Sequence, residues 1–433
     1  MALFDADYYA DPYSAFARLR EDAPAHHVTM PDGQSAWLVT RAADVQRLFG
    51  DPRLSMDKAH AKAYVGFSLP PELDANLTNM DGDAHHRLRR IVSASFTARR
   101  VEAMASGIQS VATRLVEAFE GPSVDLIPAY TSQLPLHVIS DLLGVPSADR
   151  LPFAAWTTQM FAPSHPREAA AAVSHMQAFM LDLVALRRTA PGDDLLSAII
   201  SARDEQDRMS EHELVSLAFL LLLAGVENVA HVIANGVLAL LGDPTLRASA
   251  GLSAPSGPVP SDAIASESVP SESVPSDAVP SASGAPASDS GLSAIVEELL
   301  RHVPPLPVAL RRFPVEDIDV DGVPIPAGAT VYLGVMSANR DPSRFVDPDA
   351  FDPSRPSQHF TFGHGPHYCL GAPLARLETR IALSTLFAHH PDLRLATPVE
   401  DLPWRTSFRS HALKSLPVVL GQPGGLLPQH RVE

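Results

Sequence analysis

The stretch HFTFGHGPHYCLGAPLARLE runs from His359 to Glu378 and contains Cys369, the only cysteine of the 433-residue chain. A lone thiol cannot form an internal disulfide, so it is an inert buried side chain, a nucleophile or a metal ligand. Three glycines and Pro366 lie close to the sulfur and favour a tight irregular loop whose backbone amides approach it. From Leu370 onward the apolar spacing predicts a helix whose positive end faces the thiolate. These features favour a soft metal bound by Cys369.

Two other interpretations of Cys369 follow from the residue types alone. A zinc site could combine it with His364 and His367, although three ligands within six residues leave little room for tetrahedral coordination and no second Cys/His cluster follows. A buried structural thiol is the commoner fate of a single cysteine. Both interpretations stay open at this point.

The sequence FGHGPHYCLG, from Phe362 to Gly371, resembles the haem-ligand loop of the cytochromes P450. The positions in register with that loop are Phe362, Gly363, Gly365, His367, Cys369 and Gly371. The resemblance implies haem b (iron protoporphyrin IX) as the cofactor, with the Cys369 thiolate as the axial ligand of its iron. It also implies cofactor-binding roles for Phe362, Gly363 and Gly371, and a contact between His367 and a haem propionate.

A basic segment, DGDAHHRLRRIVSASFTARRV from Asp81 to Val101, includes the spacing of an amphipathic helix. His85 and Arg89 are four residues apart and share a helical face. By residue type alone, a solvated basic face is the default for such a run. The resemblance implies instead that both residues hold a haem propionate, because two donors on one face can reach the same carboxylate. It implies Arg312 as a further propionate partner.

The segment AGVENV, from Ala224 to Val229, lies within a long apolar stretch that we expect to be helical. Gly225 costs about 1 kcal/mol relative to Ala in a helix interior, which suggests that something approaches the backbone there. Ala-Gly-x-Glu resembles the P450 oxygen-binding kink, in which an acid, here Glu227, is followed by Thr. Asn228 and Val229 depart from that pattern because neither carries a hydroxyl, and an amide donates hydrogen bonds without being an acid. An amide that merely caps the kink is the structural alternative.

Glu298 and Arg301 are three residues apart in AIVEELLRHVPP and share a helical face. Such a pair usually lies on the surface and contributes little to stability. Upstream of the Cys369 loop, however, this E-x-x-R spacing resembles the buried ion pair of the P450 family, with Arg355 as its third member. A buried charge pair is costly without good geometry, so its expected role is to fix the position of the Cys369 loop.

The C-terminal part of the chain carries the β character. The region 311–335 has β character, with turns at Asp321-Gly322 and at Ala327-Gly328. Near the end, PWRTSFRSHALKSLPVVL resembles the terminal β-hairpin of the family, whose tip around Ser407 and Phe408 would contact substrate.

A low-complexity segment at 249–290 is nearly all Ser, Pro, Ala, Val, Asp and Glu. Because it has few large apolar residues to offset the entropy of ordering, we expect it to be disordered. This insertion is foreign to the family pattern, yet a fold tolerates it because the cost of loop closure grows only logarithmically with length.

The composition fits an ordinary soluble globular protein, with 45% hydrophobic residues and a formal net charge of −17. That charge argues against a nucleic-acid or anionic-membrane partner. The stretch Leu214–Leu241 is long enough to span a bilayer, but it includes Glu227 and His231, and a charge at the bilayer centre costs about 2.5–3.5 kcal/mol. A core helix fits better. With no visible signal peptide and one cysteine, we expect a cytoplasmic protein.

Taken together, the motifs predict a mainly α-helical single domain, 1–433, with a smaller β region and a haem between the Gly225 helix and the Cys369 loop. The resemblance implies a bacterial-type monooxygenase that uses O₂ and electrons from NAD(P)H, delivered by a ferredoxin or flavodoxin and its reductase. An acidic ferredoxin requires a basic face near the thiolate. The candidate residues for that face are Arg87, Arg90, Arg99, Arg100 and Arg376.

The substrate is not encoded in these motifs. The resemblance favours a small hydrophobic natural product, of polyketide or macrolide type, that is hydroxylated or epoxidised. One alternative is a haem-thiolate oxidase that couples or cyclises its substrate through a radical without inserting oxygen, which Asn228 keeps open. An alternative of another class is a non-catalytic haem-binding sensor.

Overall fold

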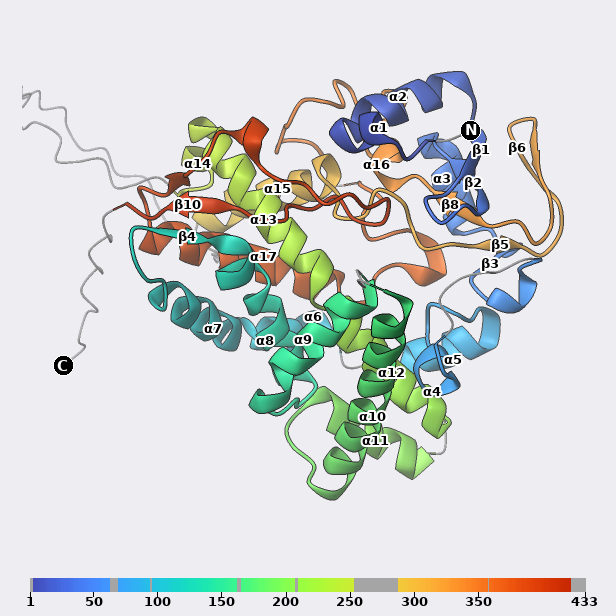
Figure 1. Ribbon diagram of the computed structural model, residues 1–433, viewed down its shortest axis with the longest axis horizontal. Helices are drawn as coiled ribbons and strands as arrows, with labels where there is room; N and C mark the ends of the chain where they lie inside the picture. The colour runs from blue at the N-terminus through green and yellow to red at the C-terminus, as the bar shows by residue number, and fades with distance from the viewer. Residues whose placement is uncertain are drawn as a thin grey trace, which may run out of the picture.

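The computed structural model describes most of the chain, namely residues 3–62, 69–93, 96–161, 165–206, 209–252, 287–356 and 358–421. Helices dominate it (Figure 1). In the first half of the chain they are α1 (Ala6–Ala10), α2 (Pro12–Asp22), α3 (Ala42–Phe49), α4 (Pro71–Asp74), α5 (Gly82–Ser93), α6 (Ala98–Ala103), α7 (Ala105–Glu117), α8 (Gln133–Leu142), α9 (Ser147–Phe161) and α10 (Pro166–Thr189). The prediction of a mainly helical protein is confirmed.

The helices of the second half include the long ones on which the candidate site is built. They are α11 (Leu195–Gln206), α12 (Glu211–Ala224), α13 (Glu227–Gly242), α14 (Pro244–Ser249), α15 (Ala287–His302), α16 (Val335–Ala338) and α17 (Ala372–His389). Short helical turns connect the longer elements: η1 (Lys58–His60), the π-helix η2 (Ile127–Thr131), η3 (Gly365–His367) and η4 (Val399–Asp401). Helix α13 crosses the middle of the molecule (Figure 1).

The β region is small and divided into separate sheets. Its strands are β1 (Ala25–Thr29), β2 (Ser35–Val39), β3 (Leu54–Ser55), β4 (Ser123–Asp125), β5 (Phe313–Pro314), β6 (Ile318–Val320), β7 (Val323–Ile325), β8 (Val331–Leu333), β9 (Arg394–Leu395) and β10 (Pro417–Val419). The orders are β1-β2-β8 and β4-β10-β9 in the two larger sheets, and β3 pairs with β5. Strands β6 and β7 form a hairpin whose turn residues, Asp321 and Gly322, both have positive φ, as a tight hairpin turn requires.

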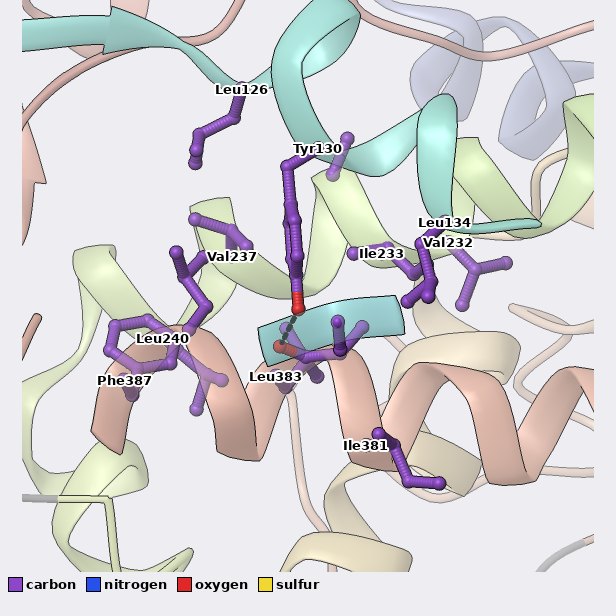
Figure 2. Close-up of a cluster of buried hydrophobic side chains, with 14 of the residues drawn as sticks. Leu126, Tyr130, Leu134, Val232, Ile233, Val237, Leu240, Ile381, Leu383 and Phe387 are labelled. Carbon is purple, nitrogen blue, oxygen red and sulfur yellow. Dashed lines mark hydrogen bonds between the residues drawn. The ribbon is translucent and has the colours of Figure 1, made fainter. Parts of the chain in front are cut away.

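Tyr130 ties the central helices together. Its ring is fully buried and stands between α13 and α17, and its hydroxyl donates a 2.8 Å hydrogen bond to the carbonyl of Ala382 (Figure 2). Apolar side chains from both helices pack around it, including Val232, Ile233 and Leu383. Gly236 of α13 lets Leu299 and Leu383 approach closely, since a Cβ there would lie 3.0–3.2 Å from their methyl groups. The core therefore fixes α13 relative to α17.

The long apolar stretch is divided into two helices, because α12 ends at Ala224 and α13 begins at Glu227. By length and composition, Arg167–Thr189 and Glu211–Gly242 are each apolar enough to cross a membrane, and 56% of the most apolar window of the second is buried. Its side chains, among them Leu217 and Ile233, contribute to two hydrophobic clusters inside the protein. This burial fits the predicted core helix.

The predicted bounds of the low-complexity insertion, 249–290, are wrong at both ends. Ser249 is the last residue of α14, Ala250 is buried, and α15 already begins at Ala287. The reason is packing: the Ser249 carbonyl approaches Gly291 so closely that a Cβ there would be 2.6 Å away, and Leu252 packs against the core. The rest of the predicted insertion, 253–286, lies outside the described residues.

Two substitutions test the role of Tyr130. Tyr130→Phe removes only the hydrogen bond to Ala382 and should lower the free energy of unfolding by about 1 kcal/mol. Tyr130→Ala also leaves a cavity and should lower it by about 3–5 kcal/mol. Denaturant-induced unfolding measures both. Equal losses of unfolding free energy in the two variants would contradict the view that packing of the Tyr130 ring contributes more to stability than its hydrogen bond.

Candidate functional site

The Cys369 loop is held by backbone geometry. Gly363 and Gly365 both have a φ of +73°, which favours glycine strongly. At Gly365 a Cβ would also lie 3.2 Å from the Phe49 carbonyl oxygen, so the end of α3 and the loop are in close contact. The Cys369 amide donates a 2.8 Å hydrogen bond to the carbonyl of Phe362. The predicted tight loop is therefore present.

The sulfur of Cys369 faces the N-terminus of α17, as predicted. The amides of Gly371 and Ala372 and the positive charge of Arg89 each lower the pKa of the thiol, but the surrounding protein raises it more. The side chain is nonetheless accessible to solvent, and a Cβ at Gly371 would meet no atom within 4 Å. The thiol thus adjoins open space at the start of α17.

His85 of a distant segment contacts His367 of this loop ring to ring, with the planes tilted by 42°. His85 of α5 is 1% exposed, and its ring centroid is 4.1 Å from that of His367. Both ring nitrogens of His85 are buried without a hydrogen-bond partner. Burial lowers the pKa of His85 to about 4, with smaller contributions from His367 and Arg89. A buried neutral imidazole without a partner is rare in native proteins, so a group outside the described chain is expected to satisfy it.

Asp81 holds His367 from the other side. Its carboxylate accepts hydrogen bonds of 2.7 Å from the Ser55 hydroxyl and from the Met56 amide, and its Oδ1 lies 2.9 Å from Nε2 of His367. Burial acts to raise the pKa of Asp81, but these partners together lower it. The sequence analysis assigned no role to Asp81. No spacing in the sequence indicates that Asp81 pairs with His367, because the two residues are 286 positions apart.

The two predicted arginine partners lie on either side of the loop. Arg312 is 4% exposed, stacks on the Phe49 ring and donates to the Phe49 carbonyl at 3.3 Å, while its Nε has no partner. Burial lowers the pKa of Arg312 to about 10. Arg89 donates to the Tyr368 carbonyl at 2.5 Å. Buried donors that lack acceptors on Arg312 and His85 fit an anionic group such as a propionate.

Glu298, Arg301 and Arg355 form a buried ion-pair cluster. Arg301 donates to both carboxylate oxygens of Glu298 at 2.7 Å, and Nε of Arg355 lies 3.4 Å from the same carboxylate. Arg301 also donates to the carbonyl of Asn339, whose side chain holds the Phe360 amide at 2.7 Å. This route connects α15 directly to the start of the Cys369 loop.

The predicted oxygen-side residues lie at the break between α12 and α13, where Ala224 is exposed and Gly225, Glu227 and Asn228 are partly buried. The backbone at Gly225 is indeed closely approached, because a Cβ there would lie 2.7 Å from Ile139 of α8. Glu227 begins α13 and forms a 2.8 Å ion pair with Arg405. Asn228 is partly buried, and within the described chain its side chain makes no hydrogen bond. Ala224 is exposed at the end of α12.

The predicted substrate-contact residues lie in a turn of the C-terminal segment. Ser407 accepts hydrogen bonds from the amides of Arg409 and Ser410 at 3.2 and 3.3 Å. The Phe408 ring contacts Phe4 and Tyr332, so it packs against the N-terminal part of the fold. Contact with substrate stays a prediction for both residues.

Two further titratable residues were missed by the sequence analysis. Glu378 of α17 is 2% exposed, its Oε2 has no partner in the described part of the chain, and burial raises its pKa well above the usual range. Arg405 lies 178 residues from its partner Glu227. Glu378 occurs in the quoted LARLE motif, but a glutamate on a helix is usually exposed. For Arg405 the sequence offers no signal at all.

The candidate basic face is partly neutralised. Arg87 pairs with Glu213 and Arg376 with Glu297, whereas Arg90, Arg99 and Arg100 are exposed on α5 and α6. The zinc alternative finds no support: in the parts of the chain that the structure describes, no group of three or more His, Cys, Asp and Glu side chains could hold a metal ion.

Comparisons with known proteins extend the likeness along nearly the whole chain. A family model described as Cytochrome P450 matches residues 291–392. Cytochrome P450 monooxygenase PikC of Streptomyces venezuelae is 37% identical, over 95% of this chain and 92% of that protein. The 6-deoxyerythronolide B hydroxylase of Saccharopolyspora erythraea is also 37% identical, over 95% and 97%. The tirandamycin C-bound P450 monooxygenase TamI matches with a TM-score of 0.81 and 36% identity, over 97% of this chain and 100% of that structure.

Substitution of Cys369 tests whether its thiolate binds the haem iron. Cys369→Ala should abolish the red-shifted absorption band that the reduced, haem-loaded protein shows when it binds carbon monoxide, because no thiolate remains to bind the iron. An absorption difference spectrum measures this band. His364→Ala, which changes an exposed residue of the same loop, is the matched control and should keep it. Retention of the band in Cys369→Ala would disprove the ligand assignment.

Proposed function

Because the chain belongs to the cytochrome P450 family and is a P450 monooxygenase, we propose that it hydroxylates or epoxidises a small hydrophobic natural product of polyketide or macrolide type. The observation that carries this proposal is the accessible Cys369 thiol at the start of α17, surrounded by buried donors without acceptors. The reaction uses O₂ and reducing equivalents that originate in NAD(P)H.

The residues around Cys369 fit a haem. When bound, a haem ligated by cysteine supplies oxygen activation, since the thiolate pushes electron density that favours O–O cleavage. We assign the two propionates to His85, Arg89, Arg312 and His367, and the wall of the loop to Phe362, Gly363 and Gly371. In this assignment the unpartnered nitrogens of His85 and Arg312 gain acceptors, which removes the cost of leaving buried donors unpaired.

The ion-pair cluster supports this site without touching substrate. Glu298 and Arg301 fix the segment that leads into the loop, and Arg355 adds a second cation to the same carboxylate. In our assignment Glu227 and Asn228 then manage protons on the oxygen side. Glu227 can hold and release a proton, whereas Asn228 can only orient a water or a substrate hydroxyl through its amide. Gly225 lets Ile139 pack against the backbone at this break, and Ala224 adds only a small, exposed side chain.

Electrons must come from another protein. We propose a ferredoxin, or a flavodoxin, with its reductase, and place its docking site on the face that carries Arg90, Arg99 and Arg100. Arginines near the thiolate would attract an acidic partner to the face of the protein from which electrons travel the shortest distance to the haem. With a net charge of −17 the protein is not expected to bind nucleic acid or an anionic membrane, and we propose that it works in the cytoplasm.

The names of the relatives support the substrate class. One curated relative acts on 6-deoxyerythronolide B, and one solved relative binds tirandamycin C. At 36–37% identity, the side chains that contact substrate can differ between these proteins. We therefore infer the class of the substrate and name no individual compound.

Turnover under ¹⁸O₂ tests the function. The purified protein, loaded with haem, is combined with a surrogate ferredoxin and its reductase and screened first for compounds that shift its spin state. We expect product from a polyketide or macrolide that is heavier by one ¹⁸O atom. The control omits the reductase. Binding without turnover would favour the sensor alternative, and a coupled product without ¹⁸O would favour the radical oxidase.

Asn228 stands where the P450 pattern has Thr, so substitutions at this position test its part in proton delivery. Asn228→Thr supplies the missing hydroxyl, so it should lower the fraction of reducing equivalents lost as hydrogen peroxide if the natural reaction inserts oxygen. Peroxide formed per NAD(P)H consumed is the measurement, with Asn228→Ala as the control that adds no hydroxyl. An unchanged peroxide fraction in both variants would place Asn228 outside the proton path.

A further inference from the structure

Glu227 is held by a residue from the far end of the chain. Nη1 of Arg405 lies 2.8 Å from Oε1 of Glu227. His231, one turn further along α13, has its Nε2 4.0 Å from the same oxygen, beyond hydrogen-bond distance. In the described part of the chain, Arg405 is therefore the one fixed cation that pairs with this carboxylate.

The fold determines where Arg405 stands. Its amide donates a 2.8 Å hydrogen bond to the Ala412 carbonyl, next to the antiparallel bridge between Trp404 and Leu413. The Trp404 ring stacks on His411, with centroids 4.3 Å apart and planes 12° apart. The His411 amide donates to the carbonyl of Pro305 at 2.9 Å. The backbone of Arg405 is thus held from both sides.

The neighbouring histidine cannot replace Arg405. His231 is 5% exposed, and its Nδ1 has no partner. Burial lowers the pKa of His231 to about 3, and the positive charges of Arg405 and His411 contribute in the same direction. His231 is consequently neutral near pH 7, so it does not neutralise Glu227.

The Glu227–Arg405 pair is poorly suited to a purely structural role. The side chains of Glu227 and Arg405 are 32% and 41% exposed, and ion pairs with such exposure contribute little to folding. Glu227 also needs no cation for its charge, because a carboxylate at a helix N-terminus is already stabilised by the helix dipole. What the pair does fix is position, since a guanidinium anchored by its backbone restricts the carboxylate rotamers.

Arg405 also connects Glu227 to the turn that follows. Ser407 and Phe408, the predicted substrate contacts, are two and three residues further on in the same segment. The Phe408 ring packs against Phe4 and Tyr332, so the turn three residues beyond Arg405 is held in place by the N-terminal part of the fold.

We propose that Arg405 is a positioning residue for Glu227 and that its guanidinium holds the Glu227 carboxylate in place at the α12–α13 break. This inference rests on the proposed monooxygenase function. It assigns no chemical step to Arg405, which acts only through Glu227.

Arg405→Ala should lower product formation by about tenfold, because a catalytic group displaced by about 1 Å can lose up to about a hundredfold in rate. The lost electrons should appear as hydrogen peroxide. Arg405→Lys keeps the charge and should recover part of the rate. Lys414→Ala removes a positive charge from an exposed residue of the same segment and should behave like the unmodified protein.

Two readouts separate positioning from general damage. Haem content and melting temperature should be unchanged in Arg405→Ala, while the infrared stretch of CO bound to the reduced protein should shift, because it senses charge on the oxygen side. Adding Arg405→Ala to Glu227→Gln should cause little further loss, since both act through one carboxylate.

The outcomes are distinguishable. An Arg405→Ala protein that matches Lys414→Ala in peroxide fraction and CO stretch overturns the inference and leaves the monooxygenase function intact. Full additivity with Glu227→Gln also overturns it. An unmodified protein that binds haem but consumes no O₂ with any substrate overturns the proposed function, and the inference falls with it.

Discussion

The carboxylate of Glu298 and the guanidinium of Arg301 face each other in the interior through two 2.7 Å hydrogen bonds. Such a pair repays its desolvation only with good geometry, and its value is in fixing positions rather than in adding stability. Here the geometry extends outward: Arg301 binds the carbonyls of Asn339, Pro348 and Ala350, and Asn339 in turn holds Phe360. The Cys369 loop therefore starts from a fixed point on α15.

The loop, once placed, gathers groups from segments far apart in the chain. Phe49 at the end of α3 contacts Gly365 and accepts from Arg312, while α5 brings His85 against His367. Of these groups, His85 and Arg312 have buried ring or guanidinium nitrogens without a hydrogen-bond partner in the described part of the chain. In a folded protein that pattern indicates a ligand, because buried polar groups are otherwise paired. The family relationship identifies a haem as the ligand that these groups are proposed to bind.

The oxygen side is organised differently. The break between α12 and α13 follows from Gly225, where Ile139 packs against the backbone, and the first residue after it is the acid Glu227. Neither Asn228 nor Val229 offers a hydroxyl, so in the proposed reaction the control of protons there falls to Glu227. In the described part of the chain, Arg405 of the C-terminal segment lies 2.8 Å from the Glu227 carboxylate.

Some local features could be predicted from the sequence because they depend on neighbouring residues only. They are the glycines at special φ values, the i, i+4 pair of His85 and Arg89, and the three-residue spacing of Glu298 and Arg301. These features predicted the Cys369 loop, whereas the mainly helical fold was predicted from apolar spacing together with the resemblance to the P450 family. The bounds of the 249–290 insertion were wrong, since packing against the core overrode composition at its ends. The pairs Asp81–His367 and Glu227–Arg405 span 286 and 178 residues. Only the tertiary structure decides them, because a contact between distant segments depends on how whole elements pack and leaves no spacing in the chain.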